Sequence, residues 1–531
     1  IGFFCSNFVV SSNTSLPSPK LHDCSLMNSI IIDTRGISKI IQSLKPSSSP
    51  GVDLITSKFL QGTASYSSIL LTKLFQQSID SGSLPIQWKI GKVVAVHKSG
   101  SKESPLNYRP TSLTSIPCKV LEHVLYTSIV TFLESNSFFT DAQHGFRKGF
   151  SCETQLLSFT HQLHRILDRR SKVDCIFLDF AKAFEKVSHN LLLLKLSKLN
   201  LDRDVFKWLE HFLCGRTHFV AANSYNSPEC SVNSGVPQGS VLGPLLFLIY
   251  INDLTDCISS NIHLFADDCV IFREINDTSD VSIIQNDLNA ISNWCSLWLV
   301  NLIIKKCKVL RVCRTSTTTA SYHLNNVLLD CVSSYRYLGV HITSCLTWSV
   351  HISNIINNAN RMLGYLRRNF SSSPASLKLL MYKNLVRSKL EYAASVWDPS
   401  MVYLIKALKL VQNNSARFIL HDYDRTASVT AMKNSLQLTS LSSRRKFFRL
   451  CLFHKIFHNS PHLRANLFLS PSYGSSRIDH AHKVGIPICQ TRTCSESFVP
   501  RTSKDWNQLP GATATITDYQ LFRAALTNIV N

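Results

Sequence analysis

From about residue 91, short runs of β-branched and aromatic residues alternate with longer stretches that have the apolar spacing of helices. Three of the short runs are 93–96, 175–178 and 269–272. Their length and composition are typical of strands, whereas the longer periodic stretches are typical of helices. This mixture predicts an α+β fold in which helices lie on one face of a sheet.

The chain divides into five segments around this mixed region. The first, 1–34, is rich in Ser, Pro and Asn and is predicted to be a linker. The second, 35–90, has helical apolar spacing and is predicted to be a helical N-terminal extension. The mixed region is predicted to span 91–345, and two mostly helical segments, 346–400 and 401–531, are predicted to follow it.

The composition favours a globular protein with a polyanionic partner. Hydrophobic residues make up 44% of the 531 residues, and the formal net charge is +22. A chain of this length can bury a sizeable core. So large a positive charge favours nucleic acid as the partner, although basic proteins also bind anionic membranes.

The 17 cysteines are scattered singly, and no Cys-x-x-Cys pair occurs. This pattern excludes a zinc ribbon and a thioredoxin-type motif, and it fits a reducing, intracellular compartment. No uninterrupted apolar run reaches the roughly 18 residues of a membrane span, so no membrane partner is expected. The chain begins at Ile1 without a signal-peptide pattern, and we interpret it as a fragment of a longer product.

Three aspartates stand where strands are predicted to end. Asp179 follows the run 176–178, and Asp267 and Asp268 lie between two β-rich runs that read as a hairpin. Two neighbouring strands could bring Asp179 beside the pair. Phosphoryl transfer by two metals about 3.5–4 Å apart needs such a carboxylate cluster, and oxygen ligands suit Mg²⁺. Taken alone, an Asp-Asp turn is usually only a solvated turn.

The residues around these acids resemble the motifs of one enzyme family. The stretches 177–184 (FLDFAKAF), 234–244 (SGVPQGSVLGP) and 265–268 (FADD) resemble motifs A, B and C of non-LTR (LINE-type, jockey-like) retrotransposon reverse transcriptases. They occur in the family's order and at similar separations. The resemblance implies a right-hand polymerase with fingers and palm in 91–345, a helical thumb in 346–400 and a helical C-terminal segment in 401–531.

The resemblance also implies roles for single residues. Asp179, Asp267 and Asp268 would be catalytic and would hold two Mg²⁺ ions, for which Mn²⁺ can substitute. The residues expected to bind the incoming nucleotide and the nascent base pair are Lys98, Arg109, Phe180, Phe184, Gln238, Gly239 and Lys306. Among these, the Phe184 ring would exclude a 2′-hydroxyl, Lys98 and Arg109 would meet the triphosphate, and Lys306 would act as a general acid. Without the motifs, each would pass for an ordinary core aromatic, turn residue or surface cation.

Further blocks resemble the same family. The stretch 143–147 (QHGFR) matches a fingers block, and 335–340 (YRYLGV) matches the hairpin that seats the primer. Three positions depart from the family pattern. Thr111 stands where Ile is common. Glu185 stands where Asp is usual, and Ile303 stands where Asn is common, which puts the loop around Lys306 in doubt.

The function implied is RNA-directed DNA synthesis, in which a DNA primer 3′-hydroxyl is extended with dNTPs on an RNA template. The expected setting is a ribonucleoprotein in the nucleus and cytoplasm. One alternative is a non-catalytic nucleic-acid-binding relic of a polymerase, against which the intact acids argue. Another is a viral RNA-dependent RNA polymerase, which Phe184 and Ala266 disfavour.

Overall fold

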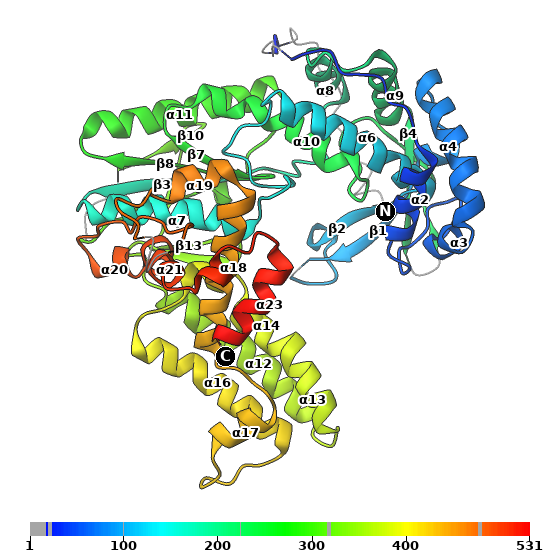
Figure 1. Cartoon of the computed structure of the whole chain (residues 1–531). Helices are drawn as coiled ribbons and strands as arrows, with labels where there is room; N and C mark the ends of the chain where they lie inside the picture. Colours follow the sequence, from blue (N-terminus) through cyan, green and yellow to red (C-terminus); the bar gives the residue numbers. More distant parts are fainter. Residues whose placement is uncertain are drawn as a thin grey trace.

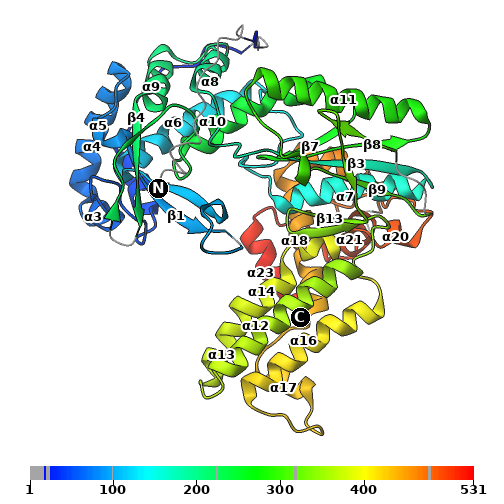
Figure 2. The same ribbon diagram turned by 180° about the vertical axis from the view of Figure 1, so that it is seen from behind.

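The computed structural model describes residues 17–19, 24–98, 100–222, 225–315, 320–475 and 480–530. Two five-stranded sheets lie apart from each other, with helices between and around them (Figure 1). A group of C-terminal helices extends away from both sheets, as the view from behind also shows (Figure 2). The predicted mixed class is confirmed in this coarse form.

The first sheet has the strand order β12-β9-β3-β8-β7. Its strands are β3 (Lys172–Asp179), β7 (Asn261–Phe265), β8 (Asp268–Ile275), β9 (Lys308–Val312) and β12 (Asp330–Cys331). All pairs are antiparallel except β12 with β9. The central strand β3 therefore has both neighbours antiparallel to it, and every residue of its core segment is tied on two sides.

Helices cover both faces of this sheet. On one face, residues such as Ile176 and Ile271 join a core with α10 (Leu242–Ile251) and α11 (Thr278–Leu297). On the other, Phe177 and Phe272 pack against Phe159 of α7 (Cys152–Asp168). Figure 1 shows α7 beside the strands of this sheet. The expectation that helices lie on one face only was wrong, because both alternating series of side chains along β3 and β8 are apolar.

The second sheet has the order β2-β1-β4-β5, and β6 also pairs with β4. Its strands are β1 (Ile90–His97), β2 (Tyr108–Leu113), β4 (Arg216–Ala222), β5 (Tyr225–Asn226) and β6 (Cys230–Val232). Strands β1 and β2 form an antiparallel hairpin, and β1 pairs with β4 in parallel. The helices near this sheet are α2 (Thr34–Ser43), α3 (Ser57–Gly62), α4 (Ala64–Ser81), α5 (Ile86–Lys89) and α9 (Arg203–Leu213).

Helix α6 (Ile116–Ser135) follows β2 of the second sheet along the chain. It packs against α10, which shares a core with the first sheet. Among the described residues it is the one helix that is long and apolar enough to cross a membrane. Of its 18-residue apolar stretch, 56% is buried inside the protein. Lys119 and Glu122 interrupt its apolar sequence, so this helix contains no uninterrupted apolar run of about 18 residues. The fully buried Glu122 carboxylate accepts hydrogen bonds from Val241 N (2.7 Å) and Leu242 N (3.0 Å) at the start of α10. These contacts are those of a core helix.

The chain beyond the sheets is almost entirely helical. Its longer helices are α12 (Ser349–Asn369), α16 (Val402–Leu420), α18 (Leu441–Asn459), α21 (Phe498–Asn507) and α23 (Tyr519–Val530). The other elements are η1 (Pro105–Asn107), α8 (His189–Leu196), η2 (Asn252–Cys257), η3 (Ile304–Lys306), β10 (His323–Leu324), β11 (Val327–Leu328), β13 (Ser334–Tyr337), β14 (Val340–Thr343), α13 (Ala375–Met381), η4 (Tyr382–Arg387), α14 (Ser388–Glu391), α15 (Ala394–Trp397), α17 (Val429–Ser435), α19 (Pro461–Leu467), α20 (Arg492–Ser495) and α22 (Gly511–Ala514).

Cations in α18 are used to hold these helices together. Asp398, just after α15, accepts hydrogen bonds from Arg445 Nε (2.5 Å) and Arg449 Nε (3.0 Å). Both arginines are 2% exposed. Because both arginines pair with a buried carboxylate, they are not free to bind a nucleic acid. Removing either arginine would leave buried charge without its partner.

Part of the predicted linker is fixed to the core. Residues 24–33 have no helix or strand, as expected, but Cys24, Met27, Ile30 and Ile32 are buried. Met27 N donates to Asn200 O (3.0 Å), and Asn200 Nδ2 donates to Cys24 O (2.8 Å). The Ser- and Asn-rich composition hid the apolar residues that bind this stretch to the rest of the protein.

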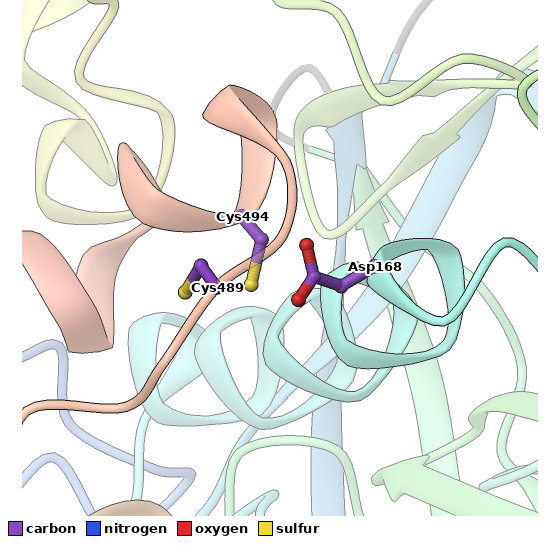
Figure 3. A group of neighbouring side chains, drawn as sticks. All are labelled: Asp168, Cys489 and Cys494. Carbon is purple, nitrogen blue, oxygen red and sulfur yellow. The ribbon is translucent and has the colours of Figure 1, made fainter.

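Asp168, the last residue of α7, bonds to the stretch of chain just before α20 and so holds the C-terminal segment against α7 (Figure 3). Its carboxylate accepts hydrogen bonds from Gln490 N (2.9 Å), Thr491 N (2.7 Å) and Thr491 Oγ1 (2.7 Å). Burial opposes ionisation, but these three hydrogen bonds lower the pKa of Asp168 overall. The bonds therefore stabilise the charged carboxylate, and they order the chain just before α20.

The thiols of Cys489 and Cys494 lie beside this carboxylate (Figure 3), with all three potential ligand atoms within 4.8 Å of one another. Burial raises the pKa of the Cys494 thiol well above its ordinary value, and Cys489 Sγ donates to Pro487 O (3.6 Å). Metal binding needs thiolates. Because the pKa of the Cys494 thiol is raised and the carboxylate already accepts three hydrogen bonds, we assign this cluster to packing.

We predict that Asp168→Ala lowers the free energy of unfolding by about 2–3 kcal/mol, because hydrogen bonds to a charged group contribute about that much. Chemical denaturation at pH 7 measures this. The pKa of Asp168 is depressed in the folded state, so the difference from wild type should shrink as the pH falls through that depressed pKa.

The exposed Asp330, which pairs with Lys308 on the surface, offers a matched control. Asp330→Ala should change stability by about 0.5 kcal/mol or less. Equal losses in the two variants would contradict the assigned role of Asp168.

Candidate active site

Two of the three aspartates face each other across adjacent strands. In the β3–β8 pair, Asp179 at the end of β3 is directly opposite Asp268 at the start of β8. Side chains paired in this way lie on the same face of a sheet, with Cα atoms about 4.5–5.5 Å apart. Asp179 continues the series Cys175 and Phe177 along its strand, so both acids lie at the edge of the face that α7 covers.

Asp267 is placed beside this pair by a tight turn. Strands β7 and β8 are joined by a two-residue connection, with Phe265 paired to Asp268. Ala266, the first residue of the connection, has φ +54°. Turns that suit the twist of a hairpin need positive φ at this position, which usually selects glycine or asparagine. The sequence has alanine there, so the turn must be held by its surroundings.

The three carboxylates repel one another. Burial and then repulsion by Asp267 and Asp179 raise the pKa of Asp268 to about 6. Burial, together with Asp179, also raises the pKa of Asp267. The Asp268 side chain is still exposed to solvent. A site that concentrates negative charge in this way is stabilised by a cation.

Cations of the protein approach the cluster but do not neutralise it. The charges of Lys98 and Arg109 act to lower the pKa values of Asp267 and Asp268, against the larger effects that raise them. Both come from the β1–β2 hairpin, where Lys98 N donates to Asn107 O (2.7 Å), and both side chains are exposed. The sequence-predicted cations therefore lie on the side of the cluster that solvent reaches.

The donor set fits divalent metal ions. Carboxylate oxygens are the ligands that Mg²⁺ prefers. Within the described part of the chain, the one set of three acidic, His or Cys ligand atoms mutually within 4.8 Å is the Asp168 cluster, so the ligand atoms of Asp179, Asp267 and Asp268 do not all lie within that distance of one another. The Asp168 cluster stands at the far end of β3, about 25 Å away along eight residues of strand.

Lys306 forms an ion pair with the cluster. Its Nζ lies 3.4 Å from Asp179 Oδ1, and the lysine side chain is 57% exposed. The loop before it is fixed to motif A by backbone contacts, because Ala181 N donates to Asn301 O (2.7 Å) and Ile303 N donates to Asp179 O (2.8 Å). Since these bonds use the main chain, Ile303 in place of Asn leaves the loop in contact with β3.

Phe184 packs between two other aromatic rings. Its ring stacks on Phe247 of α10 with centroids 4.3 Å apart and planes at 21°. Phe146 meets its other side edge-on at 6.1 Å. Phe184 is half-buried, so part of the ring remains accessible. Phe180, in contrast, is 5% exposed and its side chain belongs to the core, which leaves only its backbone for contact with a ligand.

The glycine-rich loop of motif B makes close contacts with β2 of the second sheet and with the segment that follows β3. Gly239 has φ +124°, and a Cβ there would lie 2.4 Å from Ser112 O of β2. Ser112 N donates to Gln238 O (2.8 Å). The Gln238 side chain donates from Nε2 to Glu185 Oε1 (3.4 Å). The longer Glu185, where the family usually has Asp, therefore reaches the motif B loop.

Two residues near the cluster received no individual role from the sequence. Tyr335 stacks on Phe177 with centroids 3.9 Å apart, and burial followed by the charges of Asp268 and Asp179 raises its pKa to about 12. Gln143, which is 2% exposed, accepts a hydrogen bond from Ala266 N (2.9 Å). The 143–147 and 335–340 blocks were recognised as family-like, but their side-chain contacts depend on tertiary pairing.

Comparison with known families matches residues 96–342 to the family described as "Reverse transcriptase (RNA-dependent DNA polymerase)". The matched stretch contains all ten predicted site residues. It also includes both five-stranded sheets apart from residues 90–95 of β1.

Curated relatives extend the similarity beyond that stretch. The chain is 30% identical over 395 residues to the "Probable RNA-directed DNA polymerase from transposon X-element" of Drosophila melanogaster, which covers 72% of this chain and 43% of that protein. It is 25% identical over 422 residues to the "RNA-directed DNA polymerase from mobile element jockey" of the same species, which covers 76% and 46%.

A third relative of this kind is from transposon BS, also of Drosophila melanogaster, at 27% identity over 401 residues, with 72% of this chain and 44% of that protein covered. The chain thus spans less than half the length of these relatives. The matched domain, the motif residues and the jockey-like relatives agree with one another. The chain belongs to the reverse transcriptases of non-LTR, LINE-type retrotransposons.

Proposed function

We propose that this chain carries out RNA-directed DNA synthesis, extending a DNA primer 3′-hydroxyl with dNTPs on an RNA template. The observation that carries the proposal is the pairing of Asp179 with Asp268 on adjacent strands, with Asp267 in the turn between β7 and β8. The relatives are named RNA-directed DNA polymerases, which supports the same activity here. Nicked chromosomal DNA is the proposed primer and the element's own RNA the proposed template.

The proposed architecture is a right hand. The sheet that contains β3 and β8 would be the palm, and the sheet around the β1–β2 hairpin would belong to the fingers, within 91–345. Helices in 346–400 would form the thumb, followed by a C-terminal segment in 401–531. Support comes from the charges of Lys98 and Arg109, on the β1–β2 hairpin, which act on Asp267 and Asp268 of the other sheet. The separate group of C-terminal helices also supports it (Figure 2).

Asp179, Asp267 and Asp268 would hold two Mg²⁺ ions, and Mn²⁺ can take their place. When bound, such ions lower the pKa of an attacking hydroxyl and stabilise charge on a leaving phosphate. The aspartates orient that chemistry because sheet pairing fixes Asp179 and Asp268. Lys306, which approaches Asp179 within 3.4 Å, would turn to the leaving pyrophosphate and donate a proton.

The remaining predicted residues would position the nucleotide. Lys98 and Arg109 would bind the triphosphate, since Arg presents a fork of donors and Lys a point charge. The Phe180 backbone would face the nucleotide, and the Phe184 ring would close the space that a 2′-hydroxyl needs. Gln238 and Gly239 would lie against the nascent base pair, where glycine allows close approach.

The net charge of +22 supports binding of nucleic acid, which should weaken steeply with salt. We propose an intracellular ribonucleoprotein, present in the nucleus and cytoplasm, as the working form. The non-catalytic alternative predicts RNA binding without extension. The RNA polymerase alternative predicts that NTPs are preferred over dNTPs.

We predict that Asp267→Asn with Asp268→Asn lowers primer extension by about 10³-fold or more, because metal charge stabilisation contributes several kcal/mol and each 1.36 kcal/mol is a factor of ten. RNA binding should persist, because the substitution removes negative charge. Extension of a labelled DNA primer on RNA measures the first, and filter binding measures the second. Asp330→Asn, on the same sheet but outside the cluster, is the control; full extension by the double variant would contradict the site assignment.

We predict that stability without divalent ions falls as the pH rises from about 4 to about 6. The folded-state pKa of Asp268 is raised from 3.8 to about 6, so the folded protein binds more protons than the unfolded chain in that window. Asp268→Asn should remove this part of the loss. Melting temperatures of both proteins at pH 4.5 and 7, with EDTA and with Mg²⁺, measure it; the account requires that Mg²⁺ raise the wild-type value more than the variant's at pH 7.

We predict that Phe184→Val allows NTPs to be used, raising the ratio of NTP to dNTP incorporation by about tenfold or more, since one pocket group contributes 1–3 kcal/mol of discrimination. Single-nucleotide extension gives kcat/KM for each. The Phe247→Leu variant removes the ring beneath Phe184 and tests whether packing alone causes the change. An unchanged ratio in Phe184→Val would exclude this ring as the sugar gate.

A further inference from the structure

The segment before α7 forms an extra strand-like contact on the catalytic hairpin. Leu264 N donates to Ala142 O (2.8 Å), and His144 N donates to Leu264 O (2.9 Å). Strand β7 is otherwise the edge of its sheet, with an unpaired row of backbone groups. The segment therefore covers that edge directly beside the turn that carries Asp267.

The side chain of Gln143 bonds to both backbone groups of one turn residue. Its Oε1 accepts from Ala266 N (2.9 Å), and its Nε2 donates to Ala266 O (3.5 Å). Oε1 also accepts from Gly145 N (2.8 Å). The side chain is 2% exposed, so water does not compete for these bonds.

Ala266 is the residue of the turn that most needs such support. Its φ of +54° is unfavourable for a residue with a Cβ, and Asp267 follows directly. Gly145 allows the approach, because a Cβ at that position would lie 2.3 Å from Ala266 N. Any relaxation of Ala266 toward negative φ would rotate the following peptide and move the Asp267 and Asp268 carboxylates.

The same segment also contacts Phe184 of motif A. Arg147 holds it in place, because its Nη1 donates to Thr140 O (2.8 Å) and its Nη2 pairs with Glu134 (3.0 Å). Phe146 contacts the ring of Phe184 edge-on at 6.1 Å. Residues 142–147 therefore touch the turn of motif C and the aromatic residue of motif A at once.

We propose that Gln143 is a positioning residue, whose carboxamide holds Ala266 in its left-handed conformation and thereby sets the placement of the Asp267 and Asp268 carboxylates for metal binding. This inference rests on the proposed function. The buried Gln143 carboxamide bonds to Ala266 and Gly145. Its effect is on the geometry of the ligands, so metal affinity should respond more than nucleic-acid binding does.

The test is Gln143→Met, which keeps the length and apolar packing of the side chain and removes all three hydrogen bonds. Losing such support for metal ligands typically costs about 10–100-fold in metal affinity or activity. We expect kcat for primer extension to fall by about that factor and the Mg²⁺ concentration for half-maximal rate to rise. The dissociation constant for the RNA–DNA template–primer, measured in EDTA, should stay within about twofold, since phosphate contacts dominate it.

A second substitution separates positioning from folding. Glycine adopts positive φ without steric cost, so Ala266→Gly should keep the turn formed without Gln143. Combined with Gln143→Met, it should recover about tenfold of the lost rate and restore the Mg²⁺ midpoint, as coupled neighbours do. Gln412→Met is the matched control, because Gln412 is also buried (1% exposed) and donates to Thr439 O (2.9 Å) far from the acids.

Each outcome decides the proposal. Normal rate and Mg²⁺ midpoint in Gln143→Met overturn it, while wild-type extension leaves the proposed function standing. If Gln412→Met loses as much rate as Gln143→Met does, Gln143 is a folding residue and the proposal is overturned. The same holds if Gln143→Met lowers the melting temperature and template binding and Ala266→Gly does not restore them. If wild type itself shows no extension, the proposed function fails. The positioning role is then decided by Mg²⁺-induced stabilisation in wild type and its reduction in Gln143→Met.

Discussion

The antiparallel pairing of β3 with β8 is the constraint on which the site depends. It sets Asp179, the last residue of β3, opposite Asp268, the first residue of β8. Carboxylates so close repel, as the raised pKa of Asp268 reflects. The apolar residues behind them, such as Phe177 and Phe272, are buried between the sheet and α7 and supply the stability that keeps the charges together.

Around this pair, the protein uses backbone contacts to fix the loops. Gly239 and Gly145 are positions where a Cβ would collide with Ser112 O and Ala266 N, and Gln143 and Gln238 add side-chain bonds beside them. Contacts of this kind tolerate little change in residue size. They connect motif B to the β1–β2 hairpin and motif C to the segment before α7, so the separate motifs act as one assembly.

The mixed fold class and the acids could be predicted from sequence because each depends on local pattern. The strand 175–178 is a continuous apolar run, and Asp179 stands at its end. Burial on both faces was missed, although the continuous apolar runs 175–178 and 269–272 carry that signal, because they place apolar side chains on both faces of their strands. The roles of Gln143 and Asp168 were missed because their partners, Ala266 and Thr491, lie 123 and 323 residues away. The fixed stretch 24–33 was missed because its few apolar residues are diluted by Ser and Asn.

The central claim is that Asp179, Asp267 and Asp268 share a pair of divalent ions. Electron paramagnetic resonance with Mn²⁺ tests it most directly, on the chain bound to an RNA template, a chain-terminated DNA primer and the next dNTP. The account predicts two bound Mn²⁺ whose spins couple, as ions about 3.5–4 Å apart do, and loss of this signal in Asp179→Asn. An uncoupled signal, or one unchanged by that substitution, would contradict it.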